Sequence, residues 1–292
     1  MKYQIVHTTE YYYHQVVSLC HNIALLTPRN SKLQECRKTA IKITPQPDVI
    51  NEYNDFFGNK VLYFAVQQEH SSLRVTVMSQ VETYKDREQT TELYNHIAWE
   101  EMEHLLSVPG EDNFEARQFI PATPITGSTS EIHEYAMRSF TPRRSMLEAC
   151  RDLVQRIFDD FEFTPGFTTL ATPLTEVMEQ RKGVCQDFAH LAIACLRSIG
   201  LPARYVSGYI ETVAPEGTEK LRGVDASHAW FSVFIPQSGW IDFDPTNNLI
   251  PSDQHITIGW GRDYSDLPPL KGVILSIGSH QLEVSVDVKR LD

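Results

Sequence analysis

The chain has 292 residues, of which 41% are hydrophobic and 22% are charged, and this composition is typical of a globular protein with a buried core. Its length predicts one large domain or, more in keeping with the usual domain size, two. The formal net charge of −12 argues against nucleic-acid binding, which needs clustered lysine and arginine, and no apolar run approaches the length of a membrane span.

Residues 1–95 consist of short runs in which apolar and polar residues alternate, separated by Pro, Gly and Asn. Such runs are typical of β-strands, and their spacing predicts an antiparallel sandwich or barrel. We assign this range to an N-terminal β-sandwich domain. The expected strands cover residues 3–8, 16–26, 40–44, 61–66 and 73–82. The scattered histidines of this region are interpreted as surface or core residues: His7, His14, His21 and His70.

Residues 96–145 are less regular and are assigned to a partly helical connecting region. The domain boundary is expected between about residues 90 and 115. A short helix is expected over residues 99–106 and a second over residues 131–139, and residues 119–128, rich in Pro, Thr, Gly and Ser, are typical of a connector.

Residues 146–292 are assigned to a core with C-terminal strands. Apolar residues at helical spacing predict a helix over residues 146–158, and Cys150 lies on its apolar stripe, which indicates a core position. A short helix should begin near Thr172. The strands that follow the next helix are expected over residues 204–211, 226–236 and 240–246, with a polar loop at residues 215–218. They predict an antiparallel meander.

The five cysteines are odd in number and scattered, with no C-x-x-C pair: Cys20, Cys36, Cys150, Cys185 and Cys195. Such usage argues against a disulfide framework and against a zinc ribbon. The first residues are typical of a strand rather than a signal peptide, because no long apolar run follows them. We therefore expect a reducing, cytoplasmic location, with no cofactor and no metal.

Cys185 stands at the start of a predicted helix that ends near Gly200. Unpaired backbone N–H groups and the helix dipole at such a position favour a thiolate over a thiol. Taken alone, this cysteine is equally well read as a small buried residue.

A thiol nucleophile needs a base and a partner that orients the base. His228 lies early in the second meander strand, and Asp242 and Asp244 lie together on one face of the third. Spacing alone leaves the choice between the two acids open.

Several segments, in this order, resemble the transglutaminase-like superfamily. They are residues 183–190, 200–209, 226–230, 239–240 and 244–248. Residues 27–29, 55–59 and 259–272 extend the resemblance to the bacterial branch whose members are described as candidate cysteine proteases. The resemblance implies an α+β chain with a papain-like core, in which the helix carrying the cysteine packs on an antiparallel sheet. It also implies a triad of Cys185, His228 and Asp244, and so favours Asp244 over Asp242.

The expected function is therefore thiol-dependent acyl transfer on a peptide, a protein or a small amide, with hydrolysis by a cysteine protease or amidase preferred. The first alternative is a protein-glutamine transglutaminase or deamidase, which shares the same first chemical step. The second is a protein-interaction module without activity. A Cys/His metal site is the weakest reading, because a structural zinc site needs four ligands.

Overall fold

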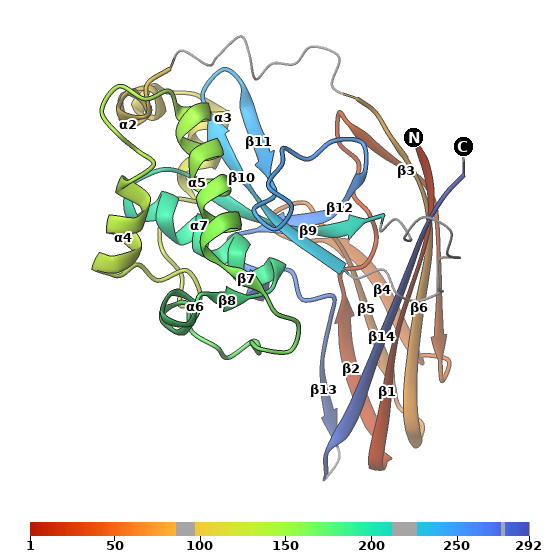
Figure 1. Cartoon of the computed structure of the whole chain (residues 1–292). Helices are drawn as coiled ribbons and strands as arrows, with labels where there is room; N and C mark the ends of the chain where they lie inside the picture. Colours follow the sequence, from red (N-terminus) through yellow and green to blue (C-terminus); the bar gives the residue numbers. More distant parts are fainter. Residues whose placement is uncertain (86–96, 212–226, 276–277, 292) are drawn as a thin grey trace, which may run out of the picture.

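The computed structural model describes residues 1–85, 97–211, 227–275 and 278–291, and Figure 1 shows a β-sandwich beside a core of helices and a further sheet. The sandwich has two four-stranded antiparallel sheets. The first has the order β14 (His280–Arg290), β1 (Lys2–Val17), β6 (His70–Thr83), β3 (Gln34–Thr44). The second has the order β13 (Leu270–Leu275), β2 (Leu19–Ala24), β5 (Lys60–Val66), β4 (Val49–Asn54). Apolar side chains such as Val17, Phe64 and Val75 are buried between them.

The core sheet is also antiparallel, and its order is β11 (Gly239–Phe243), β10 (Ser227–Ile235), β9 (Ala203–Ile210), β12 (His255–Gly261). The predicted three-stranded meander is therefore confirmed as β9, β10 and β11. Helix α7 (Cys185–Ser198) packs against β9 and β10, and every residue from Asp187 to Arg197 is buried. Burial on all sides explains why α7 is apolar around most of its circumference rather than along one stripe.

The remaining helices surround α7. The longest is α5 (Met146–Asp160), and it buries a stripe that includes Cys150, which confirms the core position of that cysteine. The shorter elements are η1 (Trp99–Glu101), α2 (Met102–Ser107), α3 (Glu111–Arg117), α4 (Ser130–Met137), β7 (Glu162–Phe163), α6 (Leu174–Gln180), β8 (Lys182–Gly183) and η2 (Tyr264–Asp266). The predicted α+β class, with N-terminal antiparallel sheets followed by a core in which a helix packs on an antiparallel sheet, is confirmed. No helix of the described residues is long and apolar enough to cross a membrane.

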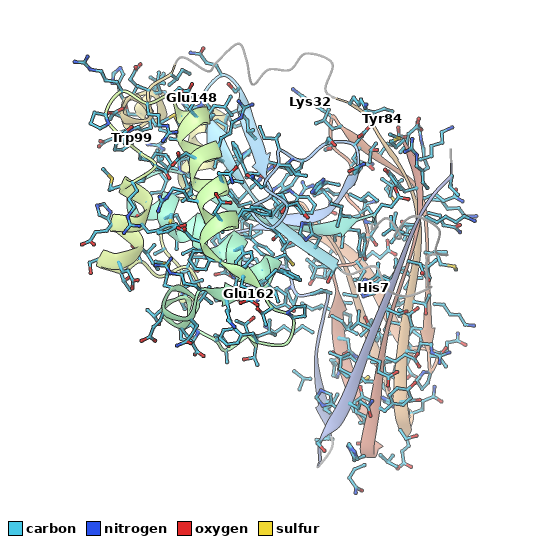
Figure 2. All side chains as sticks on the ribbon, viewed as in Figure 1. His7, Lys32, Tyr84, Trp99, Glu148 and Glu162 are labelled. Atoms are coloured by element: carbon cyan, nitrogen blue, oxygen red, sulfur yellow. The ribbon has the colours of Figure 1, made fainter. Side chains whose placement is uncertain are left out.

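The sandwich packs directly against the core sheet. Tyr3 and Ile5 of β1 share a buried cluster with Tyr209 of β9 and Ile256 of β12. Beside this cluster the His7 Nδ1 atom lies 2.9 Å from the hydroxyl oxygen of Tyr209, and Figure 2 labels His7 in the sandwich. Burial lowers the pKa of His7 to about 4, so this ring is neutral at physiological pH. The two parts of the chain therefore share one continuous apolar boundary.

The C-terminal strands belong to the sandwich and not to the core sheet. The sequence groups them with residues 146–292, but β13 pairs with β2 and β14 pairs with β1, so both complete the sandwich. Without them β1 and β2 would each present a row of unpaired backbone groups at a sheet edge. Alternating residues show which face of a strand is buried but not which strand is its partner. The rest of the domain division stays a prediction.

Several elements differ from the expected ranges. β1 continues to Val17 where a short strand is expected, and β4, α3 and β12 are not predicted as separate elements. Helix α6 begins one residue later than the expected Thr172 cap implies, with Pro173 at its N-cap. The polar loop expected at residues 215–218 lies outside the described residues.

Candidate active site

Cys185 is the first residue of α7, as the sequence predicts, and it is half-buried. Its helical turn is held by Asp187, whose Oδ2 atom accepts the Val184 backbone N–H at 2.8 Å and the Thr168 hydroxyl at 2.6 Å. Burial raises the pKa of Asp187 even though these two hydrogen bonds oppose the shift. A Cβ atom at Gly183 would lie 3.0 Å from the Asp187 carboxylate, so glycine keeps this approach open. Asp187 thus caps the helix that presents the thiol.

His228 joins the other two predicted site residues. Its Nε2–H donates to the Oδ2 atom of Asp244 at 2.7 Å, and its ring also hydrogen-bonds the thiol of Cys185. Because Nε2 faces the carboxylate, Nδ1 is the nitrogen available to the sulfur. The three residues therefore form a chain of contacts in the order Cys185, His228, Asp244.

The electrostatics of this chain favour a charged imidazole. Burial of the His228 ring lowers its pKa, but hydrogen bonds with Asp244 and Cys185, and the negative charge on both, outweigh burial and raise the pKa to about 10. Burial likewise raises the pKa of Asp244, but hydrogen bonds from His228 and His255 outweigh it and hold that pKa well below its usual range. An imidazolium beside a carboxylate is the arrangement that stabilises a thiolate.

Asp244 accepts more hydrogen bonds than the sequence suggests. Besides His228, its Oδ2 atom accepts from His255 Nε2 at 3.0 Å and from Asn247 Nδ2 at 2.7 Å. Its Oδ1 atom accepts the backbone N–H groups of Thr246 and Asn247 at 3.0 and 3.2 Å. The side chain is fully buried, so five donors replace water around one carboxylate. Sequence reasoning missed His255, because one histidine on an unpredicted strand carries no spacing signal.

Asp242, the other acid that spacing allows, has different partners. Its Oδ2 atom accepts Trp230 Nε1–H at 2.9 Å, and its Oδ1 atom accepts the hydroxyl of Ser232. Both partners lie on β10, the strand that carries His228. Asp242 therefore holds neighbours of His228 in place, while Asp244 holds the ring itself.

The raised pKa of His228 predicts a pH-dependent stability. A group whose folded-state pKa is raised binds its proton more tightly in the folded state, so its stabilisation is complete below pH 6.5 and is lost as pH rises toward about 10. We expect the difference in free energy of unfolding between wild type and His228→Gln to shrink over this window in urea titrations. The same substitution at the exposed His104 is the control; a constant difference at His228 would contradict the raised pKa.

His228, Asp244 and His255 are arranged for hydrogen bonding rather than for binding a metal ion. Among the described residues, His228, Asp244 and His255 each offer a ligand atom, all within 4.8 Å of one another. However, both imidazole nitrogens that face Asp244 are its hydrogen-bond donors, and each would have to lose that proton before it could bind a cation.

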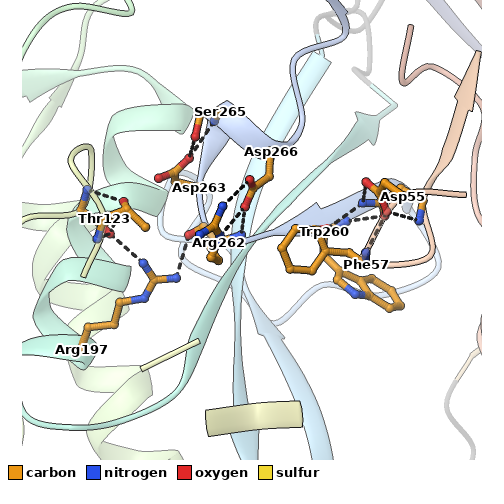
Figure 3. A network of polar contacts seen from close by, with 11 residues as sticks. Asp55, Phe57, Thr123, Arg197, Trp260, Arg262, Asp263, Ser265 and Asp266 are labelled. Atoms are coloured by element: carbon orange, nitrogen blue, oxygen red, sulfur yellow. Dashed lines mark hydrogen bonds and ion pairs between the residues drawn. The ribbon is translucent and has the colours of Figure 1, made fainter. Parts of the chain in front are cut away.

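Two further buried polar residues brace the helix behind Cys185. The Nε2 atom of His190 accepts the Tyr264 backbone N–H at 3.1 Å, and burial lowers the pKa of this ring to about 4. Arg197 donates to the backbone carbonyls of Phe119 and Arg262 at 2.8 and 2.7 Å, and burial lowers its pKa to about 10. Figure 3 shows Arg197 reaching toward the segment that carries Thr123. These contacts hold α7 to the chain around it.

A cavity of about 530 Å³ lies away from Cys185, His228 and Asp244. Its lining includes Phe56 and Phe57 of the sandwich and Gln118, Arg262 and Asp266 of the core. β12 begins at His255, and Arg262 comes directly after its last residue. The cavity is therefore separated from the His228 ring by most of the length of a strand.

Comparisons with known proteins agree with the fold. The family model of the bacterial transglutaminase-like N-terminal region matches residues 3–82, and that of the transglutaminase-like superfamily matches residues 134–245. An uncharacterised protein of Mycobacterium tuberculosis H37Rv is 39% identical over 292 aligned residues, which cover 98% of this chain and 92% of the relative.

Two more distant similarities concern proteins whose descriptions name an activity. The protein-glutamine gamma-glutamyltransferase of Pseudomonas aeruginosa is 32% identical over 107 residues, which are 34% of this chain and 16% of that protein. A candidate cysteine protease from Cytophaga hutchinsonii has a TM-score of 0.78 at 21% identity, covering 100% of this chain and 91% of that one. The second similarity shows a shared fold over the whole described chain.

Proposed function

Because the chain belongs to the transglutaminase-like superfamily, with a bacterial transglutaminase-like N-terminal region, we propose that it is a thiol acyl-transfer enzyme. In this proposal Cys185 is the nucleophile, His228 is the acid and base, and Asp244 orients the imidazole. The observation that carries it is the His228 ring, which contacts the Asp244 carboxylate on one side and the Cys185 thiol on the other. The reaction we favour is hydrolysis of a peptide or carboxamide bond.

The first half-reaction forms an acyl-enzyme. The Cys185 thiolate attacks the carbonyl carbon of the substrate, and a carbon–sulfur bond forms while the carbonyl oxygen becomes an oxyanion. The backbone N–H of Cys185, in the first turn of α7, is a donor suited to that oxygen. The His228 imidazolium then gives a proton to the leaving amine as the carbon–nitrogen bond breaks, and a thioester and a neutral imidazole remain.

The second half-reaction decides the class of enzyme. Neutral His228 takes a proton from the acceptor, the acceptor oxygen or nitrogen bonds to the acyl carbon, and the carbon–sulfur bond breaks to restore the thiolate. Water as acceptor gives an acid, and a primary amine gives a new amide. We favour water because it surrounds any open active site, whereas an amine acceptor needs a binding site of its own.

The alternative is a protein-glutamine transglutaminase or deamidase. It is favoured by the similarity to the Pseudomonas aeruginosa protein-glutamine gamma-glutamyltransferase. An interaction module without activity is a weaker alternative. Burying the Asp244 carboxylate among five hydrogen-bond donors has a desolvation penalty, and a protein that only binds a partner through its surface does not need such a group.

A product analysis distinguishes these functions. A glutamine-containing peptide is incubated with the enzyme, with and without a primary amine, and the products are identified by mass spectrometry. We expect cleavage in both reactions, and none with a Cys185→Ala control. Deamidation or amine incorporation as the main product would instead support the deamidase or the transglutaminase, and an unreactive Cys185 thiol would support the interaction module.

We also propose that the protein works in the cytoplasm. All five cysteines are free, and Cys36 and Cys185 are half-buried rather than enclosed, which suits a reducing compartment. Fractionation of cells that express the native gene tests this location, and release of the protein by osmotic shock would contradict it.

A further inference from the structure

The outer edge of β12 is paired with side chains instead of a strand. β12 is the last strand of the core sheet, so its outward backbone groups have no strand partner there. Gln34 accepts the Thr257 N–H at 2.7 Å and donates to the Thr257 carbonyl at 2.8 Å. Asn59 accepts the Trp260 N–H at 3.0 Å and donates to the Trp260 carbonyl at 2.8 Å. Each amide thus takes the place of a peptide group on a neighbouring strand.

Both amides belong to the sandwich, and their surroundings hold them firmly. Gln34 and Asn59 are 3% and 1% exposed. Asp55 accepts the Asn59 side-chain N–H at 2.8 Å, and Figure 3 shows Asp55 beside Trp260. A Cβ atom at Gly259 would lie 2.5 Å from the Asn59 Oδ1 atom, so only glycine allows this approach.

A stacked arginine reinforces the same contact. The Arg29 guanidinium lies 3.1 Å from the centroid of a Trp260 ring, and its Nη1 atom donates to Asn59 Oδ1 at 2.6 Å. Residues 27–29, 55–59 and 259–261, which the sequence singles out without a chemical role, therefore meet at one joint. We call Gln34, Asn59 and Arg29 the β12 clamp.

The other end of β12 carries His255 into the candidate active site. Since a carboxylate has no proton to give, His255 Nε2 is the donor in its 3.0 Å contact with Asp244. The Nδ1 atom of His255 is buried and has no hydrogen-bond partner, which favours the tautomer with its proton on Nε2. The loop before β12 is also tied to the sandwich, because Thr83 donates its hydroxyl proton to the Asp253 carbonyl at 2.7 Å.

We propose that His255 is a positioning residue for Asp244 and that the N-terminal sandwich, through the β12 clamp, holds His255 in place. The inference rests on the proposed function, because Asp244 matters here as the partner of His228. It gives the N-terminal region a role in the chemistry although Cys185, His228 and Asp244 all lie outside that region. The sandwich acts through the position of one strand.

The proposal predicts a specific change in pH dependence. Among the described residues, the titratable groups that face Asp244 are His228 from β10 and His255 from β12, and Asn247 faces it from its own loop. Loss of the His255 N–H removes one of the hydrogen bonds that lower the pKa of Asp244. We call the fall of Cys185 reactivity at low pH its acid limb. This limb should then move to higher pH, since Asp244 becomes protonated at a higher pH.

The test uses the full chain and needs no known substrate. The rate of alkylation of Cys185 by iodoacetamide is followed against pH by peptide mapping. For His255→Ala we expect a decrease of roughly tenfold to hundredfold at neutral pH, as for the loss of a hydrogen bond to a charged group, and an acid limb moved upward. His255→Gln keeps an N–H donor near the Nε2 position and should recover most of the rate. A lower rate with an unmoved limb, or no recovery with Gln, would overturn the positioning role.

The clamp is tested with Gln34→Ala and Asn59→Ala. Each should slow alkylation by roughly two- to thirtyfold and move the acid limb in the same direction. Asn22→Ala is the matched control, because it removes another buried amide of the sandwich, one that donates to the Cys20 sulfur. It should leave the profile unchanged. If an alanine variant does not fold, Thr83→Val is a milder test. Valine has nearly the same size as threonine but lacks the hydroxyl that donates to the Asp253 carbonyl.

A double-mutant cycle separates the clamp from general loosening of the fold. Gln34→Ala should have less effect in the His255→Ala background than in wild type, because β12 then carries no donor to position. Equal effects in both backgrounds would contradict the coupling. A wild-type thiol that does not depend on His228 would overturn the proposed function itself, whereas a normal dependence on His228 with unaffected His255 and clamp variants would overturn this inference alone.

Discussion

Replacing Cys185 with alanine should end both turnover and active-site alkylation. The loss of turnover should be on the order of 10⁵- to 10⁶-fold, the scale found when the nucleophile of a covalent triad is removed. The physical reason is that no other described cysteine lies beside an imidazolium: Cys185 is the thiol that hydrogen-bonds His228. Activity assays and peptide mapping after brief iodoacetamide treatment measure the two effects.

The buried cysteines are the controls. Burial raises the pKa of Cys195 to about 12 and that of Cys150 beyond its ordinary range, so neither should be alkylated under native conditions. Cys150→Ala should therefore keep the wild-type labelling rate, with its effect confined to stability, since it opens a small space in the α5 stripe. Equal labelling of Cys150→Ala and Cys185→Ala would remove Cys185 from the nucleophile role.

The second large effect is expected for Asp244→Asn, with a decrease in turnover of roughly 10⁴-fold. All five hydrogen bonds at this side chain come from donors that point at its two oxygens. An amide in either orientation turns its NH₂ group toward donors, because donors face both carboxylate oxygens. In either orientation His228 also loses the negative charge that stabilises its protonated ring. The pKa of His228 should fall toward 6.5, because that charge, together with the strong hydrogen bond to a carboxylate, raises it. Turnover and the ¹⁵N chemical shifts of the ring against pH report both changes.

Asp242→Asn is the matched control for this variant. The two acids are separated by one residue, but Asp242 contacts Trp230 and Ser232 and not the imidazole. Its substitution should change turnover by only a fewfold and leave the tautomer of His228 unchanged. If Asp242→Asn caused the larger loss, the role given to Asp244 would be wrong. Melting temperatures of both variants show whether either loss reflects unfolding.

The local pattern of residues predicts much of this structure. The helix that begins at Cys185, the meander that follows it and the strand alternation of the N-terminal region all follow from periodicity, which depends on near neighbours. The position of His228 in the second meander strand follows in the same way. Spacing leaves two acids for its partner, and the family resemblance favours Asp244, which is the one that contacts the ring.

What periodicity misses are contacts between residues far apart in the chain. His255 reaches Asp244 from a strand whose edge is completed by Gln34 and Asn59, and no local pattern connects these positions. The partners of β13 and β14 escape prediction for the same reason. Asp187 is visible in the sequence, but its role as a helix cap depends on the turn that precedes α7.

The pairing of β14 with β1 has a consequence for how the protein is made. Tyr3 lies opposite Arg290, so β1 pairs with a strand that is synthesised much later than β1 itself. Non-local pairing of this kind folds slowly, and the sandwich exposes the edges of β1 and β2 until β13 and β14 have been synthesised. The nascent chain therefore contains Cys185 before the sandwich that contacts β12 is complete. We expect Cys185 to become fully reactive only after β14 has been synthesised and has paired with β1.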